Sequence, residues 1–396
     1  MRPATASAPP LETRIVKLLL INYEFPPVGG GAANATSCLS RALEDLGHEV
    51  TVLTTAFGAL RGTATEAGVD IVRVRTLRRS ADRSNPVEML SFLLAAMIPA
   101  LRLARRRRFD ATIAFFTIPS GPISCLLWLL LGIPYIVSLR GGDVPGFVPE
   151  IDSIHRLIAP LRRAVLARAC AIVANSQSLA RLSAAADPFP VEVIPNGVDP
   201  QAFAPEQATS ASKDEFRMLF VGRLHSQKNV GMLLESAAAL AALPGPRVVL
   251  EIVGDGPERP ALEALAARTG AARVLRWQGW LAKPDVLACY RRAHVFVNPS
   301  LYEGMPNTVL EAMACGVPVV ASQIGGNEDL VVEGATGFLF DLAAPQQLTA
   351  ALQRLRISPE LGIGLGARGR RRVIDEFSWP GVASQYLQML AQRVPS

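Results

Sequence analysis

Lysine is almost absent from this sequence of 396 residues. Only four of its 40 basic residues are lysines, so arginine carries nearly all of the net charge of +6. The arginines are dispersed and few aromatic residues lie among them, so a nucleic-acid-binding protein is not expected. Half of the residues are hydrophobic and 19% are charged. This composition excludes a disordered tail or a low-complexity polymer, and the length predicts two or three globular domains.

Cysteine and histidine are also scarce. The five cysteines form no C-x-x-C pair, and the four histidines form no H-x-x-x-H pair. These absences argue against a structural zinc site and against a disulfide framework. Scattered thiols are typical of a reducing compartment, so we expect a cytoplasmic protein.

No targeting or membrane-spanning segment is expected from the sequence. Residues 1–15 are interpreted as a flexible leader, because no apolar run of a signal peptide follows Arg2. Proline and glycine interrupt the apolar stretch Ile118–Leu139, which therefore predicts a short helix and a strand rather than a span. The apolar helix predicted over Met89–Leu103 runs into four arginines, Arg105–Arg108. It is either a core helix with a charged end or a basic surface helix, and both interpretations stay open.

Apolar, β-rich runs alternate with helical stretches along the whole chain. Continuous Val, Ile and Leu runs indicate strands that are buried on both faces, hence parallel sheets covered by helices on both sides. A single sheet of this many strands would exceed the usual size, so a break is needed. The predicted strands cover residues 17–22, 49–54, 70–74, 111–116, 135–139, 171–174, 191–194, 217–221, 247–253, 274–277, 295–298, 317–321 and 337–340.

The turn-rich segment Pro195–Pro200 supplies this break, and a polar tract from Glu206 to Glu215 follows it. We therefore predict two doubly wound α/β domains, over residues 16–198 and 199–375. Open parallel sheets bind ligands at the carboxyl ends of their strands, so two such sheets facing each other would enclose an interdomain cleft.

The most informative stretch is NPSLYEGMPNTVLEAMACG, residues 298–316, which predicts a strand, a loop and a helix that begins near Pro306. The first N–H groups of this helix, from Met305 to Thr308, would form an anion pocket beside Glu303. Glu311 follows in the helix and can accept hydrogen bonds from vicinal hydroxyls. The alternative is an ordinary capped helix with acidic residues in its first turns.

The stretch FVGRLHSQKN, residues 220–229, predicts a strand end, a glycine turn at Gly222 and a loop with two cations. The guanidinium of Arg223 and the mobile ammonium of Lys228 would suit a diphosphate. The alternative is that both side chains are solvated charges in a loop. Lys228 is one of only four lysines in the sequence, so its position in this loop is informative.

Two further stretches are rich in glycine. In FPPVGGGAAN, residues 25–34, a glycine-rich turn leads from the first strand into an amphipathic helix, where it could cradle an anion. It matches neither the dinucleotide fingerprint nor the P-loop, because Asn34 replaces the third glycine and no Gly-Lys-Ser/Thr follows. An exact GxGxxG does occur at Gly364–Gly369, but no predicted strand precedes it, so we interpret it as unrelated to ligand binding.

The stretch SLRGGDVPG, residues 138–146, lies at the end of an apolar strand, where a doubly wound sheet places ligand groups. Arg140 could hold an anion and Asp143 could act as a base or as a hydrogen-bond acceptor. A turn closed by an ion pair is equally compatible with this stretch.

Together these segments resemble a retaining glycosyltransferase of family 4 with the GT-B fold, over roughly residues 16–390. The specific matches are VGRLHSQKN, VGDGP, PSLYEGMPNTVLEAMACGVPVVAS and GGNEDLV in the C-terminal half. Glu303 and Glu311 enclose seven residues, as the glutamate pair of this family does. VIPNGVD resembles the interdomain linker of the family, and Phe377-Ser378-Trp379 resembles the start of its terminal helix. Residues 376–396 are therefore expected to cross back to the N-terminal domain.

The resemblance implies roles for residues of the C-terminal half. Arg223 and Lys228 would hold the donor diphosphate, Glu303 would hold the transferred sugar, and Glu311 would bind the ribose hydroxyls. Arg223, Lys228 and Glu303 are the expected catalytic residues. The other expected donor-binding residues are Gly222, Gly254, Asp255, Leu281, Gly304, Met305, Pro306, Asn307 and Thr308. Such enzymes typically need no metal or other cofactor, and this sequence contains no Asp-x-Asp pair.

In the N-terminal half, Gly30 and Gly31 would approach the phosphate or the acceptor. One departure concerns Arg140, which occupies the place where the family usually has a histidine in an HGxD-like context, while Asp143 is retained. An arginine cannot act as a neutral hydrogen-bond acceptor, although it could still contact the donor. Arg140 and Asp143 are kept as expected site residues.

The resemblance implies transfer of a hexosyl unit from a nucleotide diphosphate sugar to a sugar or lipid-linked sugar acceptor, in bacterial cell-surface polysaccharide or glycolipid synthesis. A nucleotide-sugar epimerase or phosphorylase on the same fold, or a non-catalytic nucleotide-sugar-binding module, are the alternatives. Arginines of the N-terminal half, Arg105–Arg108 above all, could dock the protein to an anionic membrane, on the inner face of the plasma membrane.

Overall fold

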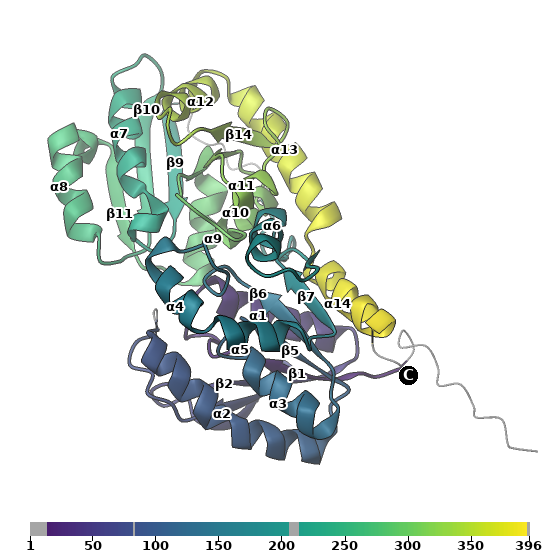
Figure 1. Cartoon of the computed structure of the whole chain (residues 1–396). Helices are drawn as coiled ribbons and strands as arrows, with labels where there is room; N and C mark the ends of the chain where they lie inside the picture. Colours follow the sequence, from purple (N-terminus) through teal and green to yellow (C-terminus); the bar gives the residue numbers. More distant parts are fainter. Residues whose placement is uncertain (1–13, 82–83, 206–213, 394–396) are drawn as a thin grey trace, which may run out of the picture. The chain divides into compact units, whose positions relative to one another are not determined.

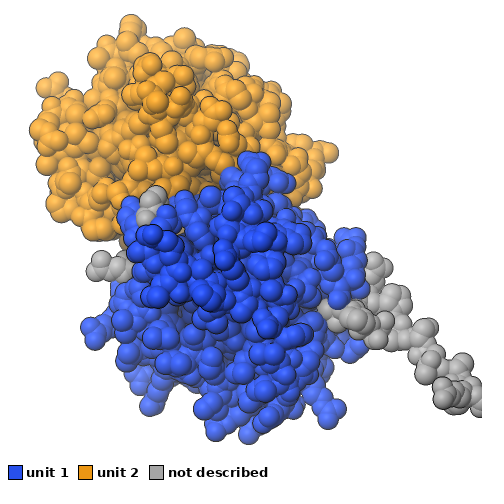
Figure 2. Space-filling view, viewed as in Figure 1, with its two compact units in different colours: residues 1–197, 379–396 blue, residues 198–378 orange. Residues whose placement is uncertain are grey.

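The computed structural model describes residues 14–81, 84–205 and 214–393. The predicted leader lies almost entirely outside the described residues, as does most of the polar tract from Glu206 to Glu215. The chain forms two compact units, coloured in Figure 2. Unit 1 comprises residues 1–197 and 379–396, and unit 2 comprises residues 198–378. The predicted boundaries, after residues 198 and 375, lie close to these positions.

Unit 1 is built on an eight-stranded sheet with the order β3-β4-β2-β1-β5-β6-β7-β8. Every pair in it is parallel except β3 with β4. The strand order reverses direction between β1 and β5, which makes this the topological switch point of the sheet. The strands are β1 (Lys17–Ile21), β2 (Glu49–Thr55), β3 (Gly62–Glu66), β4 (Val69–Val74), β5 (Ala111–Phe115), β6 (Tyr135–Leu139), β7 (Ala171–Ala174) and β8 (Glu192–Val193).

Helices cover both faces of this sheet, because its strands are apolar on both sides. Leu18 and Leu20 of β1 pack with α1 and α14 on one face, whereas Leu19 and Ile21 pack with α2 and α3 on the other. Helix α5 packs against β6 and β7. The helices are α1 (Gly31–Asp45), α2 (Pro86–Arg107), α3 (Gly121–Leu131), α4 (Asp152–Leu157), α5 (Ala159–Leu166), α6 (Gln177–Ala186) and α14 (Trp379–Arg393) (Figure 1).

The predicted parallel sheet of unit 1 carries one antiparallel strand at its edge. Strand β3 pairs antiparallel with β4 across a tight turn in which Ala67 and Gly68 both have positive φ. All residues of β3 are exposed, so it lacks the apolar run by which the other strands were predicted. The helix expected over Met89–Leu103 is also longer than predicted, because Asn85 caps its start and its last turn includes Arg105–Arg107.

Helix α14, the last helix of the chain, belongs to unit 1 although unit 2 precedes it in the sequence (Figure 1). It packs along α1, and Tyr386 and Met389 are buried in the core that α1 shares with the sheet. The Tyr386 hydroxyl lies 2.9 Å from the Ser138 hydroxyl at the end of β6. The chain therefore enters unit 2 after Gly197 and returns from it at Trp379.

Unit 2 is built on a parallel six-stranded sheet with the order β11-β10-β9-β12-β13-β14, so its switch point lies between β9 and β12. Helices α7, α8 and α12 pack on one face, and α9 and α10 pack on the other, while α13 contributes Leu365 to the first cluster and Val373 to the second. The strands are β9 (Glu215–Val221), β10 (Arg247–Val253), β11 (Leu275–Gly279), β12 (Val295–Asn298), β13 (Val319–Ser322) and β14 (Gly337–Phe340). The helices are α7 (Val230–Ala241), α8 (Arg259–Thr269), α9 (Lys283–Arg292), α10 (Asn307–Ala314), α11 (Gly325–Glu328), α12 (Gln346–Ile357) and α13 (Pro359–Glu376).

The GxGxxG sequence at Gly364–Gly369 lies inside α13 and follows a helix rather than a strand. This confirms that it is not a dinucleotide-binding turn. Its middle glycine serves packing instead, because a Cβ on Gly366 would lie 1.9 Å from the carbonyl oxygen of Gly316. The absence of a side chain at Gly366 thus lets α13 approach the turn that follows α10.

Alanine substitutions in this segment should separate packing from helix propensity. We expect Gly366→Ala to lower the free energy of unfolding by about 1–3 kcal/mol, because its methyl group would collide with the Gly316 backbone. Gly364→Ala is the matched control, since a Cβ there meets only the end of the Arg368 side chain, at 3.3 Å. It should raise the stability by roughly 0.5–1 kcal/mol. Urea unfolding measures both, and a Gly366→Ala variant as stable as wild type would contradict the packing role.

Candidate functional site

The carboxyl edge of the unit 2 sheet gathers most of the residues that the sequence singles out. The loop after β9 carries Gly222 and Lys228, and the loop after β12 carries Glu303. These two strands are neighbours in the sheet and flank its switch point. In open parallel sheets this is where loops diverge and leave room for a ligand.

Glycines bring the loops of this edge into backbone contact. A Cβ on Gly254 would lie 2.0 Å from the carbonyl oxygen of Gly222, and Gly254 has a φ of +125° that favours glycine. The Leu224 N–H donates to the Asp255 carbonyl at 3.0 Å, so the loops after β9 and β10 run together. Gly326, at the start of α11, leaves space in the same way for the carbonyl groups of Glu303 and Gly304.

An ion pair joins the two loops at the switch point. The Nζ of Lys228 donates to Oε1 of Glu303, and both side chains are mostly buried. The Ser300 hydroxyl lies 2.7 Å from the same carboxylate oxygen and 2.7 Å from Oδ1 of Asn298. Asn298 is itself buried and bonded to Asn327. The carboxylate is therefore positioned by a polar network behind it, which holds Lys228 at the edge of the sheet.

Helix α10 begins beside this ion pair. Its N-cap residue is Pro306, and no side chain caps its first N–H groups. The predicted start is thus correct to within a residue, and Gly316 follows its end with a φ of +73°. Met305 is buried, and Asn307 and Thr308 are half-buried. The positive end of the helix dipole therefore lies next to the Glu303 loop.

Glu311 lies in α10 and is paired with a tyrosine from the neighbouring helix α9. The buried Tyr290 hydroxyl donates to Oε2 of Glu311 at 3.0 Å. Burial raises the pKa of the Glu311 carboxyl from 4.5 to about 7, while the Tyr290 hydrogen bond and the charge of Lys283 act in the opposite direction. A carboxyl with such a pKa changes its charge near neutral pH, where it can either donate or accept a hydrogen bond.

Sequence reasoning missed the residues that tune these groups. Tyr290, Ser300 and Lys283 carry no motif signal of their own. Tyr290 stands next to two arginines near the end of α9, and only the structure shows that its hydroxyl reaches Glu311. A buried tyrosine hydroxyl needs a partner, but burial cannot be read from one tyrosine in a sequence.

The remaining predicted donor residues lie at the same edge. Arg223 is exposed in the loop after β9. Asp255 follows β10, and its Oδ1 accepts a hydrogen bond from the Gly256 N–H at 2.7 Å. Leu281 follows β11 and packs against the apolar cluster under α9 and α10. The structure therefore places the unit 2 predictions after the ends of four strands, β9, β10, β11 and β12, while the role of each residue stays a prediction.

In unit 1, the glycine-rich loop lies after β1, at the switch point of that sheet. Gly30 is the N-cap of α1, which starts at Gly31 without a side-chain cap. A Cβ on Gly30 would meet no atom within 4 Å, so the packing of the protein does not require glycine there. Gly29, by contrast, has a φ of +98° and lies against Glu24. The open space over Gly30 is compatible with a close approach by a ligand.

Arg140 and Asp143 are held by contacts within unit 1. The carboxylate of Asp143 accepts hydrogen bonds from the backbone N–H groups of Thr117, Arg140 and Gly141. The Arg140 guanidinium lies over the Phe115 ring, 4.5 Å from its centroid, and donates to Oδ1 of Asn196 at 2.7 Å. These contacts give both side chains a positioning role in the loop, and their predicted contact with a substrate stays a prediction.

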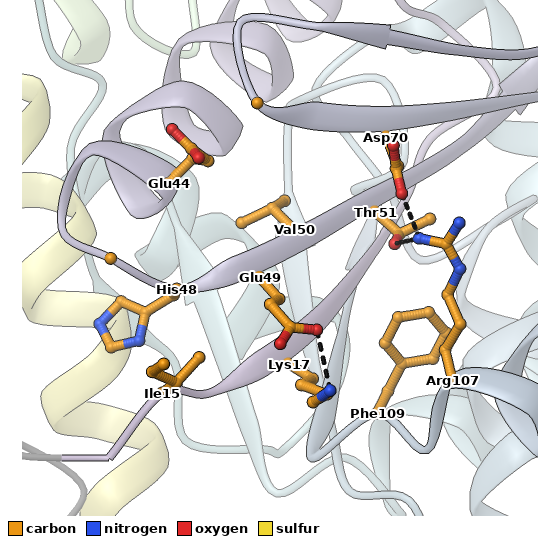
Figure 3. Close-up of a pocket in the computed structure, with 12 residues that line it drawn as sticks. Ile15, Lys17, Glu44, His48, Glu49, Val50, Thr51, Asp70, Arg107 and Phe109 are labelled. Atoms are coloured by element: carbon orange, nitrogen blue, oxygen red, sulfur yellow. Dashed lines mark hydrogen bonds and ion pairs between the residues drawn. The ribbon is translucent and has the colours of Figure 1, made fainter.

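A separate pocket of about 260 Å³ lies at the opposite edge of the unit 1 sheet, near the amino ends of β1, β2 and β4 (Figure 3). Its charged groups are largely matched in pairs. Lys17 contacts Glu49 at 2.9 Å, and Arg107 contacts Asp70. The His48 ring accepts a hydrogen bond from the Val16 N–H through Nδ1. Arg107 belongs to the arginine run that the sequence singled out, but none of the expected catalytic or donor-binding residues lines this pocket.

Among residues 14–81, 84–205 and 214–393, no group of three or more His, Cys, Asp or Glu side chains is placed to hold a metal ion.

Solved structures of known proteins share this fold. A sucrose-phosphate synthase from Thermosynechococcus elongatus superposes with a TM-score of 0.83 and 23% sequence identity, covering 95% of this chain and 98% of that one. Anabaena HepE, in complex with UDP-glucose, superposes with a TM-score of 0.76 and 20% identity, covering 95% and 99%. The two Rossmann-like units therefore have the GT-B fold of glycosyltransferases.

Sequence comparison identifies the family. The family described as glycosyl transferases group 1 matches residues 215–356, and a glycosyl transferase 4-like domain matches residues 30–197. An alpha-maltose-1-phosphate synthase of Mycolicibacterium smegmatis is 31% identical over 300 residues, 68% of this chain and 76% of the relative. A 2-deoxystreptamine glucosyltransferase of Streptomyces kanamyceticus is 27% identical over 365 residues, 86% of this chain and 93% of the relative. The chain belongs to the group 1, GT4-type glycosyltransferases, and is an enzyme that transfers sugar from a sugar donor.

The raised pKa of Glu311 predicts a pH dependence of stability. Between pH 4.5 and about 7, the Glu311 carboxyl keeps its proton in the folded protein and loses it in the unfolded chain. The contribution of Glu311 to the free energy of unfolding is therefore complete below pH 4.5 and is lost as the pH rises through about 7. Glu311→Gln should remove this decline, which we expect to be on the order of 1–3 kcal/mol between pH 5 and pH 8. Urea unfolding at both pH values measures it. Glu235→Gln, exposed on α7, is the control. Equal pH slopes in wild type and Glu311→Gln would contradict the assignment.

Proposed function

We propose that this enzyme transfers a hexosyl unit from a nucleotide diphosphate sugar to a hydroxyl acceptor, with retention at the anomeric carbon and without a metal ion. The relatives support sugar transfer, since their names include a glucosyltransferase and a D-inositol 3-phosphate glycosyltransferase. HepE, which shares the fold, was solved with UDP-glucose. A nucleotide sugar is therefore the proposed donor.

The observation that carries this proposal is the Lys228–Glu303 ion pair at the unit 2 switch point. Breaking the anomeric bond leaves positive charge on the sugar and negative charge on the diphosphate. An ammonium has three donors, so Lys228 can keep one on Glu303 and direct the others to phosphate oxygens. Arg223, in the same loop, would add a second cation. In the absence of Mg²⁺, these cations and the uncapped start of α10 would stabilise the leaving group.

The acidic residues would position the rest of the donor. Glu303 and the backbone of Gly304–Asn307 would hold the transferred sugar. Glu311 would accept hydrogen bonds from the ribose hydroxyls as an ionised carboxylate, which can keep the hydrogen bond from Tyr290 on Oε2. Donor binding should therefore release a proton near pH 7.

The acceptor is assigned to unit 1, where Gly30 and Gly31 lie at the switch point and Gly30 lies beside open space. Arg140 and Asp143 would shape this region through the loop that they hold. A sugar or lipid-linked sugar is the proposed acceptor, in bacterial cell-surface polysaccharide or glycolipid synthesis. The proposed location is the cytoplasm, at the inner face of the plasma membrane.

Membership of the family favours a glycosyltransferase over the two alternatives that the sequence left open. An epimerase would convert the donor without any acceptor, and a phosphorylase would need phosphate. A non-catalytic binding module would not hydrolyse the donor even slowly. Incubating the donor with and without an acceptor, and with phosphate, separates these alternatives by their products.

Removal of the Lys228 ammonium should impair turnover more than it impairs folding. A hydrogen bond to a charged group contributes about 1.5–3 kcal/mol, so Lys228→Met should lower kcat/KM by roughly 10- to 100-fold. The loss should appear mainly in kcat if the contact strengthens in the transition state. Steady-state kinetics with a nucleotide sugar measure this loss, and urea unfolding is followed in parallel.

Lys17→Met is the matched control, because Lys17 also forms a lysine–glutamate pair, with Glu49, but in the pocket of Figure 3. It should keep kcat/KM within about twofold of wild type, since exposed ion pairs contribute less than about 1 kcal/mol. Wild-type turnover by a folded Lys228→Met variant would refute the leaving-group role.

The proposed chemistry also predicts insensitivity to metal removal and a defined product. Treatment with a chelator, followed by assay in chelator-containing buffer, should leave the transfer rate unchanged. Proton NMR of the initial product should show the anomeric configuration of the donor. Loss of activity that Mg²⁺ or Mn²⁺ restores would contradict metal independence, and an inverted anomeric centre would contradict retention.

A further inference from the structure

Helix α2 of unit 1 exposes an apolar stripe that nothing in the chain covers among the described residues. Its members Val87, Leu90, Leu94 and Ile98 recur at helical spacing and are each more than half exposed, from 54% to 64%. The opposite side of the helix, with Phe92 among others, is buried against the sheet. The buried side of α2 therefore packs in the core, whereas the exposed stripe is not needed for that packing.

The neighbouring helix α3 exposes further apolar side chains. Helix α3 packs beside α2 (Figure 1), and its last turn exposes Leu129 and Leu130, with Trp128 partly exposed. We call this set the α2–α3 surface, which consists of Val87, Leu90, Leu94, Ile98, Trp128, Leu129 and Leu130. Indole rings and aliphatic chains are the side chains that enter the boundary between lipid headgroups and acyl chains.

Among the described residues, the exposed charges of α2 itself have one sign. At the same helical spacing the stripe continues into Arg102, Arg105 and Arg106, which are exposed and belong to none of the ion pairs formed by the described residues. The single acidic residue of α2, Glu88, is buried and accepts a hydrogen bond from the Arg79 N–H. The exposed side of the helix thus offers no carboxylate, and a second copy of this surface would bring none to the arginines.

We propose that the α2–α3 surface lies in the plane of an anionic lipid membrane, with its apolar side chains in the headgroup boundary and the α2 arginines on lipid phosphates. Helix α2 is long and apolar enough to cross a membrane by length and composition. Its buried side, however, forms part of the unit 1 core, so a spanning helix would uncover the sheet. Docking in the interface keeps the core intact and uses only the exposed side.

The segment between β4 and α2 contacts both the glycine-rich loop and α2. The Gly29 N–H donates to the Ala81 carbonyl at 2.7 Å, and the Leu77 N–H donates to the Ser91 hydroxyl at 3.0 Å. A docked α2 would therefore bring lipid headgroups near the region assigned to the acceptor. The docking itself does not depend on that assignment and can be tested without any glycosyl transfer.

The test is co-sedimentation of the full chain with vesicles of phosphatidylcholine and phosphatidylglycerol, and with vesicles of phosphatidylcholine alone. Wild type should bind the anionic vesicles at least tenfold more tightly. Leu90→Glu/Leu94→Glu should lower the partition coefficient at least tenfold. Arg105→Ala/Arg106→Ala should lower it on anionic vesicles by roughly fivefold per arginine.

Two control variants carry substitutions of the same kinds at residues outside the α2–α3 surface. Ile357→Glu/Ile363→Glu changes exposed apolar residues of unit 2, and Arg268→Ala/Arg273→Ala changes exposed arginines near helix ends there. Both should bind vesicles as wild type does. All variants should hydrolyse the donor at the same rate in vesicle-free buffer. A variant that lost this hydrolysis would bear on the proposed function and not on the docking.

Equal vesicle binding by wild type and Leu90→Glu/Leu94→Glu would overturn the proposal, as would equal binding to anionic and neutral vesicles. Light scattering after size exclusion supplies a further check. A dimer that Leu90→Glu/Leu94→Glu converts to monomer would show that this surface is covered by a second copy, which would also overturn it.

Discussion

The ion pair between Lys228 and Glu303 is the contact on which the candidate site depends. It joins two loops that leave neighbouring strands at the switch point of unit 2, and the carboxylate is held from behind by Ser300. Without a counter-charge, a mostly buried ammonium or carboxylate would be costly to keep ionised. The pair therefore keeps a cation ready at the strand ends, where a diphosphate could share it.

The backbone around this pair is packed closely because glycines occupy the points of approach. Gly254 lies against the Gly222 carbonyl, and Gly326 lies against the carbonyls of Glu303 and Gly304. In unit 1 the corresponding edge is organised differently. There Asp143 and Arg140 form their hydrogen bonds with their own loop, with Thr117 and with Asn196, and Gly30 faces open space. The same topology thus supports a charged site in one unit and an open glycine turn in the other.

Much of this arrangement could be predicted from the sequence, because buried parallel strands are continuous apolar runs and their ends are marked by glycine. The strands that begin at Lys17 and Arg247 and the turn at Gly316 follow from such signals. Strand β3 could not be predicted, since its residues are polar and exposed and its pairing depends on β4. The Tyr290–Glu311 hydrogen bond and the Arg140–Asn196 contact join residues distant in sequence, so local pattern contains no information about them.

The most direct test of the central claim is a crystal structure of the enzyme with a nucleotide diphosphate sugar. We expect the diphosphate at the carboxyl edge of unit 2, with Lys228 Nζ within hydrogen-bonding distance of both a phosphate oxygen and Glu303. A diphosphate bound beyond the reach of Lys228, with the lysine still paired to Glu303 alone, would contradict it.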